Sequence, residues 1–354
     1  MLRTALTSLR TTGVGSHLFQ RRGFAIALDR NLKVRDLLDG QEKPCGTIDA
    51  RAPIGDAVAQ MVAEKQGALM VLDGPQVYGM LTDRDVMNEM ADPSSDFASL
   101  SVGEVASATN VTSARAVTPV FSVRQTVSLM VENFPQWRHV PVFDSKQAKA
   151  KYLGAVSILD IVQNGLASGD DVIGVDSENA TVNQALALRR RRRRMGFVNV
   201  SSADSAREAA QAMVKARCGC AFVTDDSGNL AGVFTDRDFL HKCAIEGDAD
   251  VAVSTVMNTS DLALVTPETS MQQCYEEMAN ALASGKRRVH YPVVGGAEDS
   301  DLRASFDRLD TNKDGLVSST ELKEAGEQLQ WRNDDVVGVI LLDDIVRFIH
   351  GHTL

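Results

Sequence analysis

One order of hydrophobic and polar positions recurs four times along the chain. Each copy begins with a short apolar run that predicts a strand and continues with apolar residues at helical spacing. Two further strand-length apolar runs follow. One methionine of each copy lies on the predicted buried face of the helix: Met61, Met130, Met213 and Met278. This self-similarity predicts an array of four related structural units.

The last apolar run of each copy leads into a turn of fixed spacing. A glycine is followed by two apolar residues, a fourth position that is serine or threonine in three copies, and an aspartate three residues later. The four turns are residues 79–85, 154–160, 232–238 and 338–344. The first and third turns are nearly identical, and the segments that open the second and fourth copies also match. The chain is therefore predicted to be a tandem of two pairs.

This pattern resembles the CBS domain, the module named after cystathionine β-synthase. The resemblance covers nearly everything after the first 32 residues, and its most specific element is the turn from glycine to aspartate. It implies an α+β fold of tandem CBS-domain pairs, in which small three-stranded sheets carry helices. Each pair is expected to pack sheet to sheet as one Bateman module. The four implied domains span residues 33–91, 102–166, 181–247 and 252–350.

Residues 310–321 fit the twelve-residue EF-hand loop. Oxygen-bearing side chains stand at positions 1, 3, 5 and 12, and glycine stands at position 6, where the chain must turn sharply. Apolar residues at helical spacing precede and follow the loop, which is typical of a helix-loop-helix. An Asp-, Asn- and Gly-rich turn without a metal is the alternative. The pattern predicts a Ca2+ site with five ligands: Asp310, Asn312, Asp314, the carbonyl of Leu316, and Glu321.

Residue spacing places this loop inside the fourth copy. Pro141 precedes Gly154 by 13 residues in the second copy, whereas Pro292 precedes Gly338 by 46 in the fourth, an excess of 33. This excess is about the length of one helix-loop-helix. We therefore predict an EF-hand within residues 296–331, inserted between the second and third strands of the fourth domain. Hairpin tips tolerate such insertions.

The resemblance also implies a ligand at the turns. In CBS domains the aspartate commonly accepts hydrogen bonds from ribose hydroxyls, and the serine or threonine reaches a phosphate at the helix N-terminus. The ligand would be an adenine nucleotide or S-adenosylmethionine. Leu341 replaces the hydroxyl in the fourth turn, whose aspartate is kept. The alternative is that the same residues only cap a helix, and the two roles can coexist. The candidates are Thr82 with Asp85, Ser157 with Asp160, Thr235 with Asp238, and Asp344.

Two basic features could contact phosphate. Arg138-His139 and the group of Arg287, Arg288 and His290 stand at equivalent places in the second and fourth copies, and solvated strand ends are the alternative reading. The run Arg189 to Arg194 resists packing because like charges repel. It is expected to be a solvated helix end. A polyphosphate clamp, an acidic partner or a contact with the acidic EF-hand region remain functional alternatives.

Composition narrows the functional class. The 354 residues carry a net charge of −10, which argues against nucleic acid as the main partner. No apolar run is long enough to span a membrane. Five cysteines without disulfide spacing favour a reducing compartment. Cys218-Gly-Cys220 is expected to lie in a buried strand rather than to form half of a metal site.

Residues 1–28 differ from the rest of the chain. They carry Arg3, Arg10, Arg21 and Arg22 and no acidic residue, with an amphipathic spacing of apolar positions. This composition is typical of an organelle transit peptide. Arg22-Gly-Phe24 before Ala25 resembles a matrix-processing site, so a mitochondrial matrix location is expected, with plastid as the second choice. A disordered basic tail is the alternative.

No catalytic constellation is visible, and the CBS-like repeats leave no room for a catalytic domain. The chain is therefore expected to be a regulatory sensor rather than an enzyme, with an adenosyl ligand and calcium as inputs and an unidentified effector protein as output. One alternative is a calcium-dependent scaffold, a homo-oligomer in which two hands pair between chains. Another is a mitochondrial regulator of thioredoxin-type redox enzymes, because residues 232–238 are similar to plant mitochondrial proteins made of one CBS pair.

Overall fold

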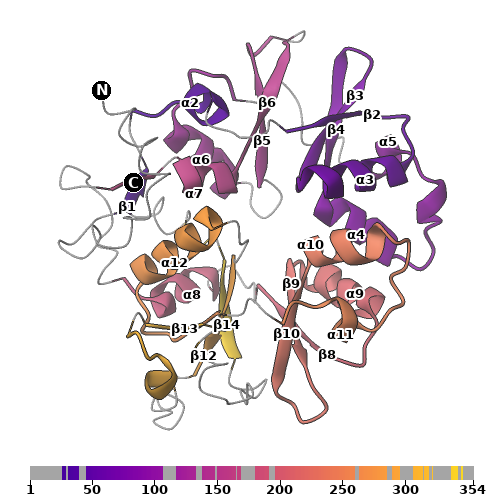
Figure 1. Ribbon diagram of the computed structural model, residues 1–354. Helices are drawn as coiled ribbons and strands as arrows, with labels where there is room; N and C mark the ends of the chain where they lie inside the picture. The colour runs from indigo at the N-terminus through magenta and orange to yellow at the C-terminus, as the bar shows by residue number, and fades with distance from the viewer. Residues whose placement is uncertain are drawn as a thin grey trace.

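The computed structural model places four small α+β units around a common centre (Figure 1). They correspond to the four sequence repeats and are called repeats 1 to 4 in chain order. The structure describes residues 26–28, 31–39, 45–106, 117–132, 138–147, 150–164, 166–168, 180–190, 196–259, 263–284, 289–295, 306–313, 315–318, 321, 336–341 and 344–345.

Repeats 1 and 3 have the same topology. The first two strands of each sheet are parallel and the third is antiparallel. Repeat 1 consists of β2 (Thr47–Asp49), α3 (Ile54–Glu64), β3 (Ala68–Asp73), β4 (Gln76–Thr82) and α4 (Asp83–Ala91), with η1 (Phe97–Ser99) after it. Repeat 3 consists of β8 (Val198–Ser201), α9 (Ala206–Ala216), β9 (Cys220–Thr224), β10 (Leu230–Thr235), α10 (Asp236–Phe239) and η3 (Leu240–Ala244).

Repeats 2 and 4 vary this plan. In repeat 2 a single parallel bridge from Val117 to Val142 stands in place of the first strand. In repeat 4 a fourth strand is added, so that the order across the sheet is β13-β11-β12-β14. Repeat 2 contains α6 (Val123–Glu132), β5 (His139–Phe143), β6 (Tyr152–Ser157) and α7 (Ile158–Asn164). Repeat 4 contains β11 (Ala263–Val265), α12 (Met271–Ala283), β12 (His290–Val294), β13 (Leu316–Ser318) and β14 (Val336–Leu341).

The repeated pattern of buried positions is confirmed. The four methionines at equivalent helix positions are all fully buried: Met61, Met130, Met213 and Met278. The predicted neighbours β12 and β14 pair directly, from His290 with Leu341 to Val294 with Val336. Val294 and Val336, on either side of the predicted insertion, therefore lie on adjacent strands.

Four short helices connect the two repeats of each pair. They are α2 (Val34–Asp39), α5 (Val102–Val105), α8 (Val182–Arg190) and α11 (Val253–Val256). In chain order each begins a predicted domain, but α2 packs on repeat 2, α5 on repeat 1, α8 on repeat 4 and α11 on repeat 3. Chain-order boundaries at 33, 102, 181 and 252 thus assign each helix to the repeat on which it does not pack. This exchange fastens the members of each pair together.

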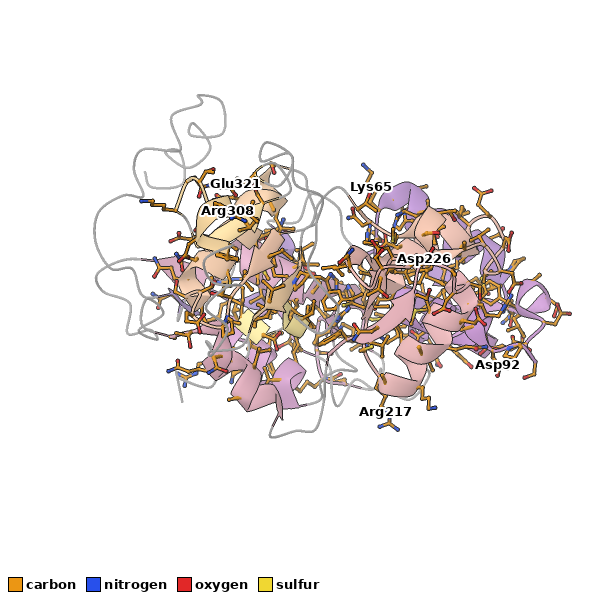
Figure 2. All side chains as sticks on the ribbon, turned by 90° about the horizontal axis from the view of Figure 1, so that it is seen from below. Lys65, Asp92, Arg217, Asp226, Arg308 and Glu321 are labelled. Carbon is orange, nitrogen blue, oxygen red and sulfur yellow. The ribbon has the colours of Figure 1, made fainter. Side chains whose placement is uncertain are left out.

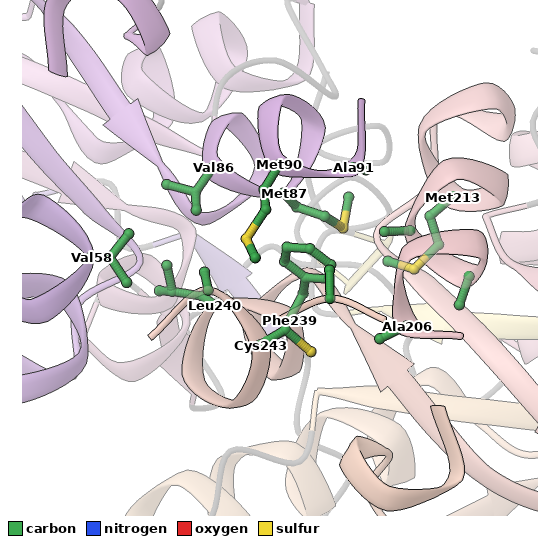
Figure 3. Packing of buried hydrophobic residues seen from close by; sticks show 14 of the residues in the cluster. Val58, Val86, Met87, Met90, Ala91, Ala206, Met213, Phe239, Leu240 and Cys243 are labelled. Carbon is green, nitrogen blue, oxygen red and sulfur yellow. The ribbon is translucent and has the colours of Figure 1, made fainter. Parts of the chain in front are cut away.

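Two kinds of apolar contact hold the repeats together. The sheets of repeats 1 and 2 meet through a small cluster that includes Met70 and Phe143, and those of repeats 3 and 4 meet through one that includes Phe222 and Val339. Helices form the other contact, because repeat 1 shares a core with repeat 3, and repeat 2 with repeat 4. Figure 3 shows the first of these helical cores, with Phe239 at its centre.

Three further predictions from composition can be compared with the structure. Strand β1 (Ile26–Leu28) pairs antiparallel with β7 (Leu166–Ser168), so the last three residues of the predicted 1–28 leader take part in the fold. A cut before Ala25 would leave this strand intact. Cys218 and Cys220 are buried, and Cys220 begins β9, which confirms the strand reading. All five cysteines are free thiols. Among the described residues, no helix is long and apolar enough to cross a bilayer.

Candidate functional site

Three of the four predicted ligand turns begin helices with a reciprocal cap. At the start of α4, the Thr82 backbone N–H and hydroxyl donate to Oδ2 of Asp85 at 2.8 and 2.7 Å. The Asp85 N–H in turn donates to the Thr82 hydroxyl oxygen at 3.3 Å. The same three bonds occur between Ser157 and Asp160 and between Thr235 and Asp238. The capping role is therefore confirmed in three repeats.

The fourth turn keeps half of this arrangement. The Leu341 backbone N–H donates to Oδ2 of Asp344 at 2.8 Å, and both residues are buried. The Leu341 side chain lies in the apolar cluster shared by repeats 3 and 4. It offers neither a cap for the helix nor a hydroxyl for a phosphate, so the chemistry of the fourth turn differs from that of the other three.

A buried ionic cluster lies where repeats 1, 2 and 3 meet. Asp236, the first residue of α10, has a side chain only 4% exposed. Its Oδ2 accepts hydrogen bonds from Arg84 of repeat 1 at 3.1 Å and from Arg138 of repeat 2 at 3.5 Å. Its Oδ1 accepts from the Arg237 backbone N–H at 3.0 Å. One carboxylate thus links the pair of repeats 1 and 2 to the pair of repeats 3 and 4.

Two glycines leave space for the contacts between repeats 1 and 3. A Cβ built on Gly219 would lie 2.5 Å from Nη2 of Arg84 and 3.0 Å from Oδ2 of Asp236, so a side chain there would displace the ion pair. Gly67 is the equivalent residue in repeat 1, and its Cβ would lie 3.3 Å from Oδ2 of Asp83. The arrangement has approximate twofold symmetry, because each repeat sends the arginine of its turn across to the other.

The approximate twofold symmetry does not hold for the arginine contacts. The pKa values of the two equivalent aspartates, Asp83 and Asp236, shift in opposite directions. Burial opposes ionisation of Asp236, but the charges of Arg138 and Arg84 outweigh it and lower the pKa of Asp236. Burial, together with the charge of Asp236, raises the pKa of Asp83 to about 7 against the opposing arginines. Arg237 donates to the Lys65 carbonyl at 3.1 Å. The surroundings therefore favour the charged form of Asp236 and disfavour the charged form of Asp83.

Sequence reasoning singled out only part of this cluster. Arg138 was expected to contact a phosphate or to be a solvated strand end, and in the structure it contacts Asp236. Asp236 and Asp83 stand between the predicted ligand residues and were passed over. The sequence signal for these aspartates was the Asp-Arg pair that recurs in the turns of repeats 1 and 3, as Asp83-Arg84 and Asp236-Arg237. Arg287 and Arg288 lie outside the described residues. So do Arg191 to Arg194 and the side chains of Arg189 and Arg190.

The predicted calcium loop closes around its two terminal carboxylates. Oδ2 of Asp310 accepts from the Gly315 N–H at 2.9 Å, and Gly315 adopts the left-handed conformation at φ 79°. The carboxylate of Glu321 accepts from the N–H and hydroxyl groups of Thr311 and Ser318 at 2.9 to 3.0 Å. Figure 2 shows Glu321 near Arg308 at the repeat 4 edge, on the opposite side of the molecule from Asp92.

The described part of the loop holds four of the five predicted calcium ligands. Asp310, Asn312, Glu321 and the Leu316 carbonyl offer oxygen atoms, which Ca2+ prefers. Burial opposes ionisation of Glu321, but hydrogen bonds from Ser318, Asn312 and Thr311 outweigh it and lower its pKa. No three His, Cys, Asp or Glu side chains converge within the described part of the chain. The third carboxylate of the motif, Asp314, lies outside it.

Comparison with known proteins agrees with the fold. Residues 34–92 and 193–244, which include most of repeats 1 and 3, match the CBS domain family. A proposed archaeal homologue of g-AMPK from Methanocaldococcus jannaschii has the same fold at a TM-score of 0.57. It is 12% identical, and the match covers 90% of this chain and 99% of that one. This match shows that the two proteins share a fold over nearly the whole of both chains.

Two further solved structures match part or most of the chain. A CBS-domain containing protein from Agrobacterium tumefaciens is 27% identical over 37% of this chain and 95% of its own, with a TM-score of 0.32. An uncharacterized conserved protein from Pyrococcus horikoshii is 15% identical over 90% of this chain and 100% of its own, with a TM-score of 0.45. No curated protein matches the sequence.

Proposed function

We propose that this chain is a non-catalytic regulatory sensor that binds an adenosyl ligand at its CBS turns and Ca2+ at residues 310–321. Its output would pass to a separate effector protein. CBS-domain proteins are typically regulatory and nucleotide-sensing. Part of this chain matches the CBS domain family, and its fold is similar to that of the proposed archaeal homologue of g-AMPK. The adenosyl ligand would be an adenine nucleotide or S-adenosylmethionine.

The observation that carries the proposal is the position of the capped turns beside the arginine cluster. Thr82 with Asp85 and Thr235 with Asp238 each hold a hydroxyl and a carboxylate at a helix N-terminus. Arg84 and Arg237 lie between the members of these pairs in sequence and reach across the contact of repeats 1 and 3. A carboxylate suits a ribose diol, and a helix N-terminus beside arginine suits a phosphate.

The cap and the ligand site can be separated by replacing Asp238 with glutamate. Glutamate completes the same capping box elsewhere in this chain, at Ser205–Glu208, so Asp238→Glu should keep the helix start. The longer side chain moves the carboxylate away from the ribose position. We expect the affinity for the adenosyl ligand to fall about tenfold or more, the scale of lost charge-assisted hydrogen bonds, while the melting temperature changes little.

Isothermal titration with AMP, ADP, ATP and S-adenosylmethionine provides the measurement. The reciprocal change, Glu208→Asp, alters a capping box with no predicted ligand role and should leave every affinity unchanged. If the wild-type chain bound none of the four compounds, the sensor proposal would fail. Equal affinities in wild type and Asp238→Glu would show that the turn at residues 235–238 is only a cap.

A scaffold is the second candidate, and the completeness of the caps favours it. Every serine or threonine turn forms all three capping bonds, so the motifs have a sufficient structural reason to exist. Under this alternative the chain would act through its surfaces and through assembly into a homo-oligomer. The titration above distinguishes the two candidates. A mitochondrial matrix location and a role toward thioredoxin-type enzymes remain proposals from the sequence.

A further inference from the structure

The strand in the middle of the calcium loop is part of the sheet of repeat 4. Strand β13 pairs antiparallel with β11, the first strand of that repeat. The partners are Ala263 with Ser318, Leu264 with Val317, and Val265 with Leu316. In repeats 1 and 3 the equivalent strands, β2 and β8, lie at the edges of their described three-stranded sheets. Repeat 4 differs because its insertion returns to cover this edge.

The covered edge matters for the energetics of the loop. EF-hand loops normally occur in pairs, and each braces the short strand of its neighbour. Here the central residue of that strand, Val317, is fully buried against a fully buried Leu264. The bracing partner therefore comes from the same chain, and a second hand from another molecule is not required. This removes the structural need that motivated calcium-dependent pairing of hands between chains.

Side chains of repeat 4 also hold the sharp turn of the loop. The Thr269 hydroxyl donates to the Gly315 carbonyl at 3.0 Å and accepts from the Thr266 N–H at 3.0 Å. Gln273 caps α12 through Ser270, and its amide packs against Gly315, where an added Cβ would lie 2.5 Å from Nε2. Gly315 thus contacts the first turn of α12 while its own N–H is bonded to the metal candidate Asp310.

An apolar cluster connects the calcium loop to the altered ligand turn at Leu341. Phe306 and Leu309, which lead into the loop, share one apolar cluster with Val317 and with Leu341, the residue that replaces the hydroxyl in repeat 4. Interior packing of this density transmits small shifts rather than absorbing them. A conformational change in the loop would therefore shift β11, the start of α12 and the turn of repeat 4.

From these contacts we infer that β11 of repeat 4 serves as the partner strand of the calcium loop, so that calcium binding and the order of repeat 4 are thermodynamically coupled. The inference rests on the proposed calcium site. Coupling is reciprocal: if Ca2+ stabilises the β11–β13 pair, then weakening that pair must weaken Ca2+ binding by the same factor. Repeat 4 would then respond to calcium at the loop. Its turn has Leu341 in place of the hydroxyl that could contact a phosphate.

Hydrogen exchange of the full-length chain with Ca2+ and with chelator tests the coupling. We expect Ca2+ to slow amide exchange in β11 and in the first turn of α12, because local opening must then break a metal-stabilised strand pair. Strand β8, the equivalent first strand of repeat 3, should not respond and is the internal control. The variant Glu321→Gln should abolish both calcium binding and this protection.

Titration of Ca2+ against two variants supplies the reciprocal measurement. Thr269→Val removes the hydroxyl that bonds to Gly315 and should weaken calcium binding about three- to tenfold, the range of one neutral hydrogen bond. Thr269→Ser keeps the hydroxyl and should leave the affinity unchanged. Absence of any Ca2+ binding to wild type would refute the calcium part of the proposed function. Binding with protection confined to residues 310–321 would instead refute only the coupling.

Discussion

Replacing Asp236 by alanine is expected to lower the free energy of unfolding by about 3 kcal/mol, the low end for breaking a buried ion pair by removing one partner. Asp236 holds Arg84 and Arg138, and its loss leaves both guanidinium groups without this carboxylate at the junction of three repeats. The low end applies because the arginine side chains are 22% and 27% exposed. Water can therefore compensate for part of the lost interaction.

The equivalent residue of repeat 1 provides the matched control for this prediction. Asp83 occupies the same turn position, but its raised pKa shows that its surroundings disfavour the charged form. Asp83→Ala should therefore destabilise much less than Asp236→Ala at neutral pH. Chemical denaturation of both variants gives the two free energies. Losses of similar size would mean that Asp236 is not the principal counter-ion of the cluster.

Replacing Phe239 by alanine is expected to lower the free energy of unfolding by about 3–5 kcal/mol, the range for a large-to-small change in a core. Phe239 is fully buried, and Figure 3 shows it between Met87 and Met90 of α4 and Met213 of α9. Its ring also makes an edge contact with Phe234 at a centroid distance of 6.3 Å. The change would open a cavity where repeats 1 and 3 pack together.

A control for Phe239 lies a short distance along the chain. Ile245 directly follows η3 and is 37% exposed, so Ile245→Ala should change the free energy of unfolding by about 0.5 kcal/mol or less, as for most surface substitutions. Thermal denaturation followed by circular dichroism measures both variants. A loss below about 1 kcal/mol for Phe239→Ala would contradict the shared helical core.

The repeated plan could be predicted because it depends on local spacing. Burial of one helix face places a methionine at the same position four times, and the glycine-to-aspartate turn fixes where each third strand ends. Residue counting predicted an insertion between the second and third strands of the fourth repeat, and the pairing of β12 with β14 brings Val294 and Val336 together. These conclusions needed only periodicity and chain length.

What sequence reasoning missed depends on contacts between distant segments. Nothing in the pattern of α2 or α8 indicates that each packs on the second repeat of its pair, since both repeats offer similar apolar faces. Asp236 resembles any helix-capping acid until Arg84 and Arg138 are placed beside it. The strand pairing of the calcium loop was also missed, because the partner of β13 in β11 is set by the sheet edge that repeat 4 leaves available.

The claim that the chain is an adenosyl-binding sensor is tested most directly by native mass spectrometry of the purified full-length protein. We predict that the wild-type chain carries, or takes up on addition, one or more molecules of AMP, ADP, ATP or S-adenosylmethionine. The double variant Asp85→Glu with Asp238→Glu should retain fewer of them while staying folded. A wild-type chain that remains bare with all four compounds present would contradict the account.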